Sequence, residues 1–337
     1  MTEFKGAKWH KCDFHLHTPA SNCFRDRTVT AEQWVDKCLD QQLDCVAVTD
    51  HNTGAWVDKI KEAAQDKRLV VFPGVELTCD TSKVHILVLF DIDKNTQYVE
   101  DFIIKCGIER KDFATSDASS PKSCMEIIQL AHDCGGLAIP AHIDEFNGLG
   151  LLSKKVISDV FSLDILNGAQ FVFSEFTQSG LKIEDICQSY NARYGRNAGD
   201  IGNEQIKQYY QCVQEAIKKN VALLTFSDNP DETNPSKHGL DGIGNAYTWI
   251  KMSQNPSLES IHQALLFPER IKNCFDSKVY PYVEPSLWIK SIDVKNTKLT
   301  KNDESFHVDF NPQLTTIIGG RGSGKSSVFR FLRGVLH

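Results

Sequence analysis

The stretch CVAVTDH, residues 45–51, shows the pattern that decides the fold: a short apolar run ends on an acidic residue and a histidine, Asp50 and His51. Three further runs end in the same way, on Glu76 (VVFPGVE, 70–76), His142 (LAIPAH, 137–142) and Asp228 (VALLTFSD, 221–228). Runs of this length are typical of buried strands. Polar residues at the ends of successive parallel strands gather on one face of an α/β protein. The pattern therefore predicts a functional site at that face.

Amphipathic stretches alternate with these apolar runs along most of the chain. We predict strands at residues 45–49, 69–72, 84–90, 137–141, 163–166 and 221–226. We predict helices at residues 31–41, 56–65, 97–107, 122–134, 203–219 and 258–266. Such alternation favours an α/β fold with a parallel sheet, and six or seven strand–helix units suit a closed barrel.

Two stretches interrupt the alternation. Residues 171–200 are polar, and we interpret them as an insertion or a long loop, either functional or a simple surface excursion. The pattern resets around PYVEP, residues 281–285. We therefore predict one domain over residues 1–285 and the start of another over residues 286–337.

The amino-acid composition limits the cellular location and the binding partners that we expect for this protein. The 337 residues are 41% hydrophobic and 24% charged, as in ordinary globular proteins, and the formal net charge is −7. This charge excludes a uniformly basic nucleic-acid coat but not a local basic channel. Eleven scattered cysteines and the lack of a secretory segment lead us to expect a cytoplasmic protein. No apolar run approaches the roughly 18–20 residues that span a bilayer, so we expect no membrane partner.

A histidine pair strengthens the predicted site. In the segment DFHLHT, residues 13–18, His15 and His17 are two residues apart, so in a strand both point to one side. His85 opens another predicted strand. A strand-end Asp or His can also cap the following helix, which is the alternative for one or two of these residues. Imidazole with carboxylate suits zinc, manganese or iron.

As an ordered set, HxH, TDH, GVE, a lone His, PAH and SD resemble the PHP (polymerase and histidinol phosphatase) superfamily over roughly residues 10–245. The resemblance implies a distorted (β/α)7 barrel that binds two or three divalent metals and hydrolyses phosphoesters. It implies metal ligation by His15, His17, Asp50, His51, Glu76, His85, His142 and Asp228. Glu76 would bridge the first and second metals, and Asp50 or His51 would serve catalysis, for instance by moving a proton.

The chain departs from this family at two positions. Where relatives often carry a histidine about six residues after HxH, this sequence has Cys23, which can ligate zinc as a thiolate. The last family motif usually reads Asp-x-His, but Asn229 and Pro230 follow Asp228 here. His238 can replace the missing histidine if its loop folds back, or it can be an ordinary loop histidine.

Arg25 and Arg27 lie on the loop after HxH. They are candidates to bind the phosphate of a substrate. The alternative is that they are solvated loop charges.

The segment GGRGSGKS, residues 319–326, satisfies the phosphate-binding pattern GxxxxGK[ST]. We predict a strand at TTII, residues 315–318, and a helix over residues 327–336. The candidate nucleotide-binding residues, for ATP with magnesium, are Gly319, Gly322, Gly324, Lys325, Ser326 and Ser327.

The stretch around this segment resembles the start of SMC- or RecF-like (ABC-type) ATPases. Together the two parts resemble PHP-domain-associated (TrlF-like) ATPases. Twelve residues follow Lys325, so we expect an ATPase domain truncated in this chain, without efficient ATP turnover of its own. The resemblance implies that the full-length protein can form a dimer through its ATPase domain.

Three functions fit these observations. The first is a nuclease-like phosphoesterase that acts on nucleic acid under the control of the ATPase. The second is a small-molecule phosphatase or nucleotide phosphodiesterase. The third is a non-catalytic, metal-binding regulatory module, which the altered Asp-x-His motif keeps open.

Overall fold

The computed structural model describes the chain except residues 1–5, 116, 199–200, 283–284, 296–304 and 337. It divides into two compact units, Lys8–Pro281 and the remainder. The division falls near the predicted domain boundary at residue 285. In the described part of the chain, no helix is long and apolar enough to cross a membrane.

The larger unit is built on a curled sheet. Its seven main strands run in the order β5-β4-β3-β2-β1-β8-β9. Their bounds are β1 Lys8–Asp13, β2 Cys45–Val48, β3 Val70–Thr78, β4 His85–Leu89, β5 Leu137–Pro140, β8 Thr248–Met252 and β9 Ile271–Asn273. A second, two-stranded sheet holds β6 (Gly168–Gln170) and β7 (Ala222–Leu224).

Hydrogen bonds join the small sheet to both edges of the large one. On one side Ile143, after β5, donates its N–H to the carbonyl of Gln170 at 2.8 Å. On the other side the Asn273 side chain of β9 donates to the carbonyl of Leu223 at 3.1 Å. The strands therefore curl into a partial barrel, consistent with the barrel that the family resemblance implies.

The prediction of a parallel sheet is only partly correct. Strands β1, β2 and β3 pair in parallel, as do β6 and β7. Strands β4, β5, β8 and β9 pair antiparallel to their neighbours. The six residues between β3 and β4 are too few for a helical crossover, so the chain reverses in a hairpin.

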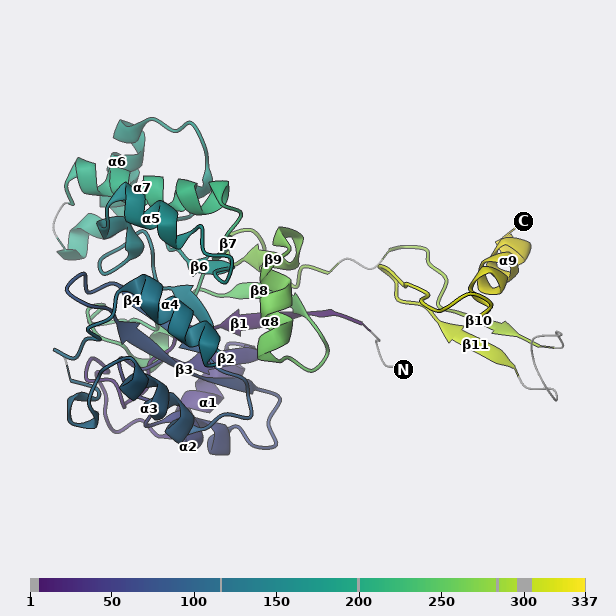
Figure 1. Ribbon diagram of the computed structural model, residues 1–337, viewed down its shortest axis with the longest axis horizontal. Coiled ribbons are helices and arrows are strands. Elements are labelled where there is room, and N and C mark those ends of the chain that lie inside the picture. Colours follow the sequence, from purple (N-terminus) through teal and green to yellow (C-terminus); the bar gives the residue numbers. More distant parts are fainter. Residues whose placement is uncertain (1–5, 116, 199–200, 283–284, 296–304, 337) are drawn as a thin grey trace. The chain divides into compact units, whose positions relative to one another are not determined.

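Helices cover the outside of the sheet (Figure 1). Their bounds are α1 Ala31–Asp40, α2 Val57–Ala63, α3 Thr96–Lys105, α4 Cys124–Asp133, α5 Lys154–Val160, α6 Ile183–Ala198, α7 Asn203–Lys218 and α8 Leu258–Leu265. Thr30 and Ser123 begin α1 and α4 with capping boxes, which satisfy backbone donors at the helix start. All six predicted helices are confirmed, and α5 and α6 were not predicted.

Alternating side chains of the strands build two apolar layers. In β2, Cys45 and Ala47 face the barrel interior, whereas Val46 and Val48 face the helices. Phe14, which directly precedes His15, packs in the interior against Phe72, with ring centroids 5.6 Å apart. This packed interior gives the strand ends a rigid base.

The strand predicted at residues 163–166 was wrong, and so was the long-loop alternative for residues 171–200. Residues 163–166 form a hydrogen-bonded turn after α5, with Leu166 N bonded to Leu163 O at 3.0 Å, and the strand begins only at Gly168. The predicted insertion or loop at residues 171–200 contains the 16-residue helix α6. Ile186, Cys187 and Tyr190 recur at helical spacing and are buried, which explains why this polar segment is helical.

The smaller unit contains an antiparallel hairpin, β10 (Ser291–Val294) with β11 (Phe306–Asp309), and helix α9 (Lys325–Leu336). The helix is confirmed. The strand predicted at residues 315–318 is wrong, since among the described residues this segment pairs with no strand, and Ile318 is 93% exposed. A strand needs a neighbour to bond its backbone groups. The fold thus gives no support to an attached ATPase domain.

Candidate metal centre

The candidate ligands meet at one edge of the curled sheet. His15 and His17 follow β1, His51 follows β2, His142 follows β5 and Asp228 follows β7. These strand ends lie side by side, so side chains far apart in the sequence converge there. The convergence confirms the clustering that the strand-end pattern predicts.

Glu76 and His85 reach the same edge through the hairpin. In the antiparallel pair β3–β4, Thr78 lies opposite His85. The start of β4 is therefore level with the end of β3, which carries Glu76. His85, at the start of β4, therefore lies beside candidate ligands that stand at the ends of other strands.

Glu76 is the centre of the cluster. Its side chain is completely buried, and imidazoles surround both carboxylate oxygens. Oε2 lies 3.1 Å from His15 Nε2, 3.2 Å from His17 Nε2 and 2.9 Å from His51 Nδ1, and Oε1 lies 2.7 Å from His85 Nδ1 and 3.4 Å from His142 Nε2.

Asp228 closes the cluster on the opposite side. Its Oδ1 lies 3.2 Å from His15 Nε2 and 3.0 Å from His17 Nε2. Asp228 and His142 have positive φ angles, 54° and 28°, which non-glycine residues rarely adopt. Backbone strain of this kind persists where the surroundings enforce it, commonly at functional sites.

The chemistry of the cluster fits divalent cations. Among the described residues, three buried polar atoms here make no well-aligned hydrogen bond: Glu76 Oε2, His142 Nδ1 and Asp228 Oδ1. Imidazole nitrogens do lie 2.9–3.2 Å from the two carboxylate oxygens, as ion-pair contacts. Buried polar atoms are normally satisfied, so an orphaned group needs an explanation. His15, His17 and Asp228 form one group with ligand spacing, and His51, Glu76 and His85 form another. Metal ions would satisfy these atoms.

The charges within the cluster keep both carboxylates ionised. Burial raises the pKa of Glu76, but His51, His15 and His85 outweigh it and hold that pKa well below its ordinary value. Burial likewise opposes the ionisation of Asp228, yet the neighbouring histidines lower its pKa. Ionised carboxylates with imidazoles are the ligand set that zinc, manganese and iron accept.

Gln170, on β6, holds two candidate ligands at once. Its Oε1 lies 2.8 Å from His15 Nδ1 and 3.3 Å from the backbone N of His142. A hydrogen bond from Nδ1–H leaves Nε2 of His15 as the lone-pair nitrogen that faces Glu76 and Asp228. Sequence reasoning missed Gln170, because glutamine is not a usual ligand and β6 has only three residues.

Asp50 lies outside this arrangement. Its carboxylate accepts hydrogen bonds from Thr18 N at 2.7 Å, Thr18 Oγ1 at 2.6 Å and Ser21 Oγ at 2.7 Å. Ser21 Oγ is also 3.1 Å from His17 Nδ1. The structure thus does not bring Asp50 among the ligand atoms, and Asp50 acts on His17 through Ser21.

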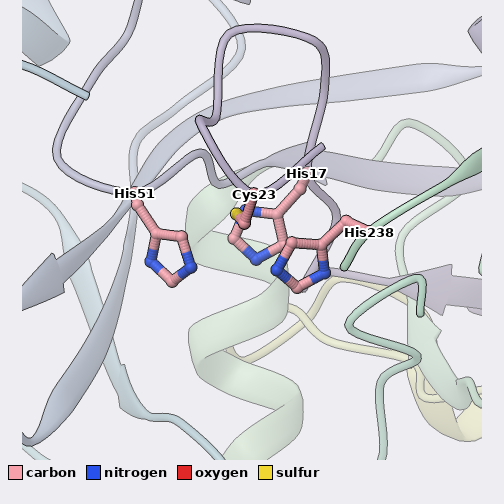
Figure 2. Close-up of side chains that lie close together, drawn as sticks. All are labelled: His17, Cys23, His51 and His238. Atoms are coloured by element: carbon pink, nitrogen blue, oxygen red, sulfur yellow. The ribbon is translucent and has the colours of Figure 1, made fainter. Parts of the chain in front are cut away.

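The loop that carries His238 folds back to the centre. His238 N donates to Cys23 O at 3.0 Å, and its ring stacks on His17 with centroids 3.9 Å apart. His17, Cys23, His51 and His238 form a third group with ligand spacing, drawn in Figure 2. Burial raises the pKa of the Cys23 thiol, but hydrogen bonds with His238 and His51 lower it to about 5.

The two candidate phosphate-binding arginines are engaged elsewhere. Arg25 pairs with Asp231 at 2.7 Å. Arg27 donates to Pro19 O at 2.5 Å and to Asn22 Oδ1 at 2.8 Å. These contacts favour the alternative that both are loop charges with structural partners.

The glycine-rich segment lies in the smaller unit. Lys325 begins α9, and its Nζ donates to Gly320 O at 2.7 Å and to Gly319 O. Gly322 and Gly324 have φ angles of 86° and 87°. Ser326 and Ser327 lie in the first turn of the helix.

The fold and the ligand cluster together define an α/β metal-binding domain. Residues 13–156 match the family model of the PHP domain. The matched range contains every candidate ligand described above except Asp228 and His238. No curated protein sequence matches the chain significantly.

Two solved structures are similar to this chain. The lesion-specific endonuclease PfuEndoQ from Pyrococcus furiosus is 14% identical, with a TM-score of 0.51 over 79% of this chain and 57% of that one. A two-domain protein from Bacteroides vulgatus with a predicted PHP-like metal-dependent phosphoesterase is 14% identical, with a TM-score of 0.48 over 81% and 66%. The chain spans less than two thirds of either protein. At this identity the endonuclease supports the fold alone.

Proposed function

We propose that this chain hydrolyses phosphoester bonds with divalent metal ions held at the Glu76–Asp228 cluster. The observation that carries the proposal is the buried Glu76 carboxylate among five histidines, with orphaned atoms on Glu76, His142 and Asp228. Neighbouring carboxylates and imidazoles can hold two metals, the arrangement used for in-line displacement at phosphorus.

Each residue has a separate task in this proposal. His15, His17 and Asp228 would hold one ion, His85 and His142 would hold a second, and Glu76 would contribute to both positions. Bound ions would polarise the phosphoryl group and lower the pKa of an attacking water. Gln170 and Ser21 fix the imidazole orientations, and Asp50 positions Ser21. The proton-transfer role of His51 stays a prediction.

We further propose nucleic acid as the substrate class, with the attached phosphate-binding segment exerting control through ATP. Support comes from the fold shared with an endonuclease and from the GxxxxGKS sequence at the start of α9. Both are arguments by analogy, because function resides in the site and not in the fold.

A substrate panel tests the function. Purified protein is incubated with manganese, zinc or iron and with single-stranded DNA and RNA, duplex DNA, nucleotides and sugar phosphates. We expect metal-dependent cleavage of a nucleic acid, with binding that weakens steeply as salt rises. Turnover of small phosphoesters alone would instead identify a phosphatase.

The double substitution His15→Ala with His17→Ala tests the role of the metal ligands in cleavage. It removes two ligands and should abolish cleavage, while circular dichroism checks that the fold survives. Cleavage that persists in a folded double variant would refute the metal mechanism. Tight metal binding by the unaltered protein without turnover of any substrate would indicate a regulatory module.

A further inference from the structure

Phe146 is an aromatic side chain that is exposed beside the metal centre. It is 76% exposed, the highest fraction among the large hydrophobic side chains that are described in the larger unit. Single exposed apolar residues are common on protein surfaces. Phe146 stands out by its position, because it follows the candidate ligand His142 by four residues and is the only exposed residue between Leu137 and Gly150.

The residue after Phe146 contacts the metal centre. Asn147 O accepts a hydrogen bond from His85 N at 2.9 Å, and Asn147 Nδ2 lies 3.3 Å from His85 Nε2. The other ring nitrogen of His85, Nδ1, lies 2.7 Å from Glu76 Oε1. Phe146 therefore stands at the rim of the cluster, next in the chain to a side chain that contacts a candidate ligand.

A tight turn holds Phe146 in place. Gly148 N donates to Glu145 O at 3.0 Å, so Phe146 and Asn147 occupy the two central positions of a β-turn. An added Cβ at Gly148 would lie 2.2 Å from His142 O. The turn therefore packs directly on the backbone of a candidate ligand and needs glycine at this close approach.

Buried contacts anchor the base of the same loop. The carboxylate of Asp144 accepts hydrogen bonds from Val172 N at 2.9 Å and Phe173 N at 2.8 Å. Tyr190 donates its hydroxyl to Asp144 O at 3.2 Å. The ring of Phe146 is therefore presented on backbone that is already ordered, so a ligand that packs on it pays little to order the loop.

An exposed aromatic ring suits recognition of a nucleobase. Arg25 and Arg27 already contact other groups of the protein, which leaves phosphate recognition by these two arginines without support. A base that stacks on an aromatic side chain gains affinity whatever its identity, because every base has a π-face. Neighbouring bases cover these faces in a duplex, so unpaired bases are the ones that stack on proteins.

We propose that Phe146 is a stacking platform for an unpaired nucleobase and positions the adjoining phosphoester at the Glu76–Asp228 cluster. This inference rests on the function proposed above and deepens it, because it names the group that is recognised. Single-stranded nucleic acid and free nucleotides share this chemistry, and the experiment separates them. Phe146 acts in binding and positioning, and it takes no part in bond breaking.

The fluorescence of 2-aminopurine reports the contact, because stacking on an aromatic ring quenches this base analogue. A short thymine strand with phosphorothioate linkages, which slow hydrolysis, carries the analogue at each position in turn. It is titrated with the full chain in the presence of manganese. We expect saturable binding with quenching at one or a few positions.

Phe146→Leu keeps an apolar side chain and removes the ring. It should weaken binding about 5–150-fold, the range that loss of one stacked base gives, and should remove the quenching. Phe146→Tyr keeps a ring and should retain both. Because Phe146 is exposed, both variants should fold, which circular dichroism checks.

Phe267→Leu is the matched control. Phe267 is 46% exposed and precedes β9, whose first residue Ile271 pairs with Ile250. Ile250 also pairs with His10, so Phe267 lies on the side of the sheet where β1 begins, away from the metal centre. This variant should leave binding and quenching unchanged.

Several results would overturn the inference. They are unchanged binding and quenching in Phe146→Leu, equal weakening by Phe267→Leu, equal binding of a strand that is abasic at the quenched position, and binding of neither strands nor nucleotides by the unaltered protein. Phe146-dependent binding of strands identifies nucleic acid as the source of the base, whereas such binding of mononucleotides alone identifies free nucleotides.

These outcomes are distinguishable from failure of the proposed function, because binding is measured without turnover. Phe146-dependent binding without phosphoester cleavage would leave the platform standing and remove the hydrolase. Metal-dependent cleavage with binding that is independent of Phe146 would do the reverse.

Discussion

Gln170 offers a sharp test of how the fold prepares the metal centre, since it contacts two candidate ligands and its own amide is not a usual metal ligand. It is 1% exposed, and its Oε1 faces both His15 Nδ1 and the backbone N of His142. The substitution Gln170→Leu keeps much of the side-chain volume and removes the acceptor. Both donors then remain buried without a partner.

The expected magnitude follows from these two contacts. A buried donor left unsatisfied costs about 1–3 kcal/mol. Because the His142 contact is long, at 3.3 Å, we expect the metal-free protein to lose about 2–4 kcal/mol of unfolding free energy in total. Loss of a group that orients a metal ligand typically weakens metal binding about 10–100-fold. This corresponds to about 1.4–2.8 kcal/mol of binding free energy.

Two measurements check the prediction. Urea denaturation of the metal-free protein gives the stability, and chelator competition gives the metal affinity. Gln170→Glu keeps an acceptor oxygen toward His15 and should bind metal more tightly than Gln170→Leu. Gln129→Leu, which alters an exposed glutamine of α4, should change neither quantity appreciably.

A folded Gln170→Leu variant that binds metal as tightly as the unaltered protein would refute this role of Gln170. Equal weakening of metal binding by Gln129→Leu would refute it too, since the effect would then be unspecific. Lower stability with unchanged affinity would restrict Gln170 to a structural role.

Further predictions concern other parts of the chain. Asp50→Asn removes acceptor capacity for Thr18 and Ser21, so thermal melts should show a loss of about 1–3 kcal/mol; complete loss of cleavage at unchanged stability would instead give Asp50 a direct role. Arg25→Ala breaks a half-exposed ion pair and should cost at most about 1 kcal/mol, with the KM for a phosphoester unchanged. A metal chelator should lower the melting temperature, because ions bound only to the folded state stabilise it by about 2.7 kcal/mol at 100 times their Kd; an unchanged melting temperature would argue against buried ligation. Lys325→Ala should abolish nucleotide binding in an equilibrium assay, and retained binding would contradict the role of the glycine-rich segment.

The sequence predicted those parts of the structure that leave a local pattern. Asp50 and His51 end an apolar run, and β2 is a strand in which every residue is buried. His85 was correctly predicted at the start of a strand, because a histidine next to an apolar run is conspicuous. That strand, β4, pairs antiparallel and not parallel as predicted. Local periodicity was sufficient in these cases.

Other features depend on contacts that no local pattern shows. Strand β8 pairs with β1, whose residues lie more than two hundred positions earlier, so Trp249 opposite Lys11 could not be anticipated. Asp50 was predicted to be a metal ligand because it directly precedes His51, yet its side chain is hydrogen-bonded to Thr18 and Ser21. Partners of this kind are set by tertiary packing.

The backbone bridge between Phe24 and His238 has a consequence for assembly. The first ligands belong to the earliest part of the domain, whereas Asp228 and His238 belong to one of its last segments. Contacts between such distant segments are slow to form, because the intervening chain must first be ordered. During synthesis, a nascent domain would therefore hold its histidines without the residues that complete the centre. Tight metal binding would therefore follow the completion of folding, and the bound ions would then stabilise the domain against unfolding.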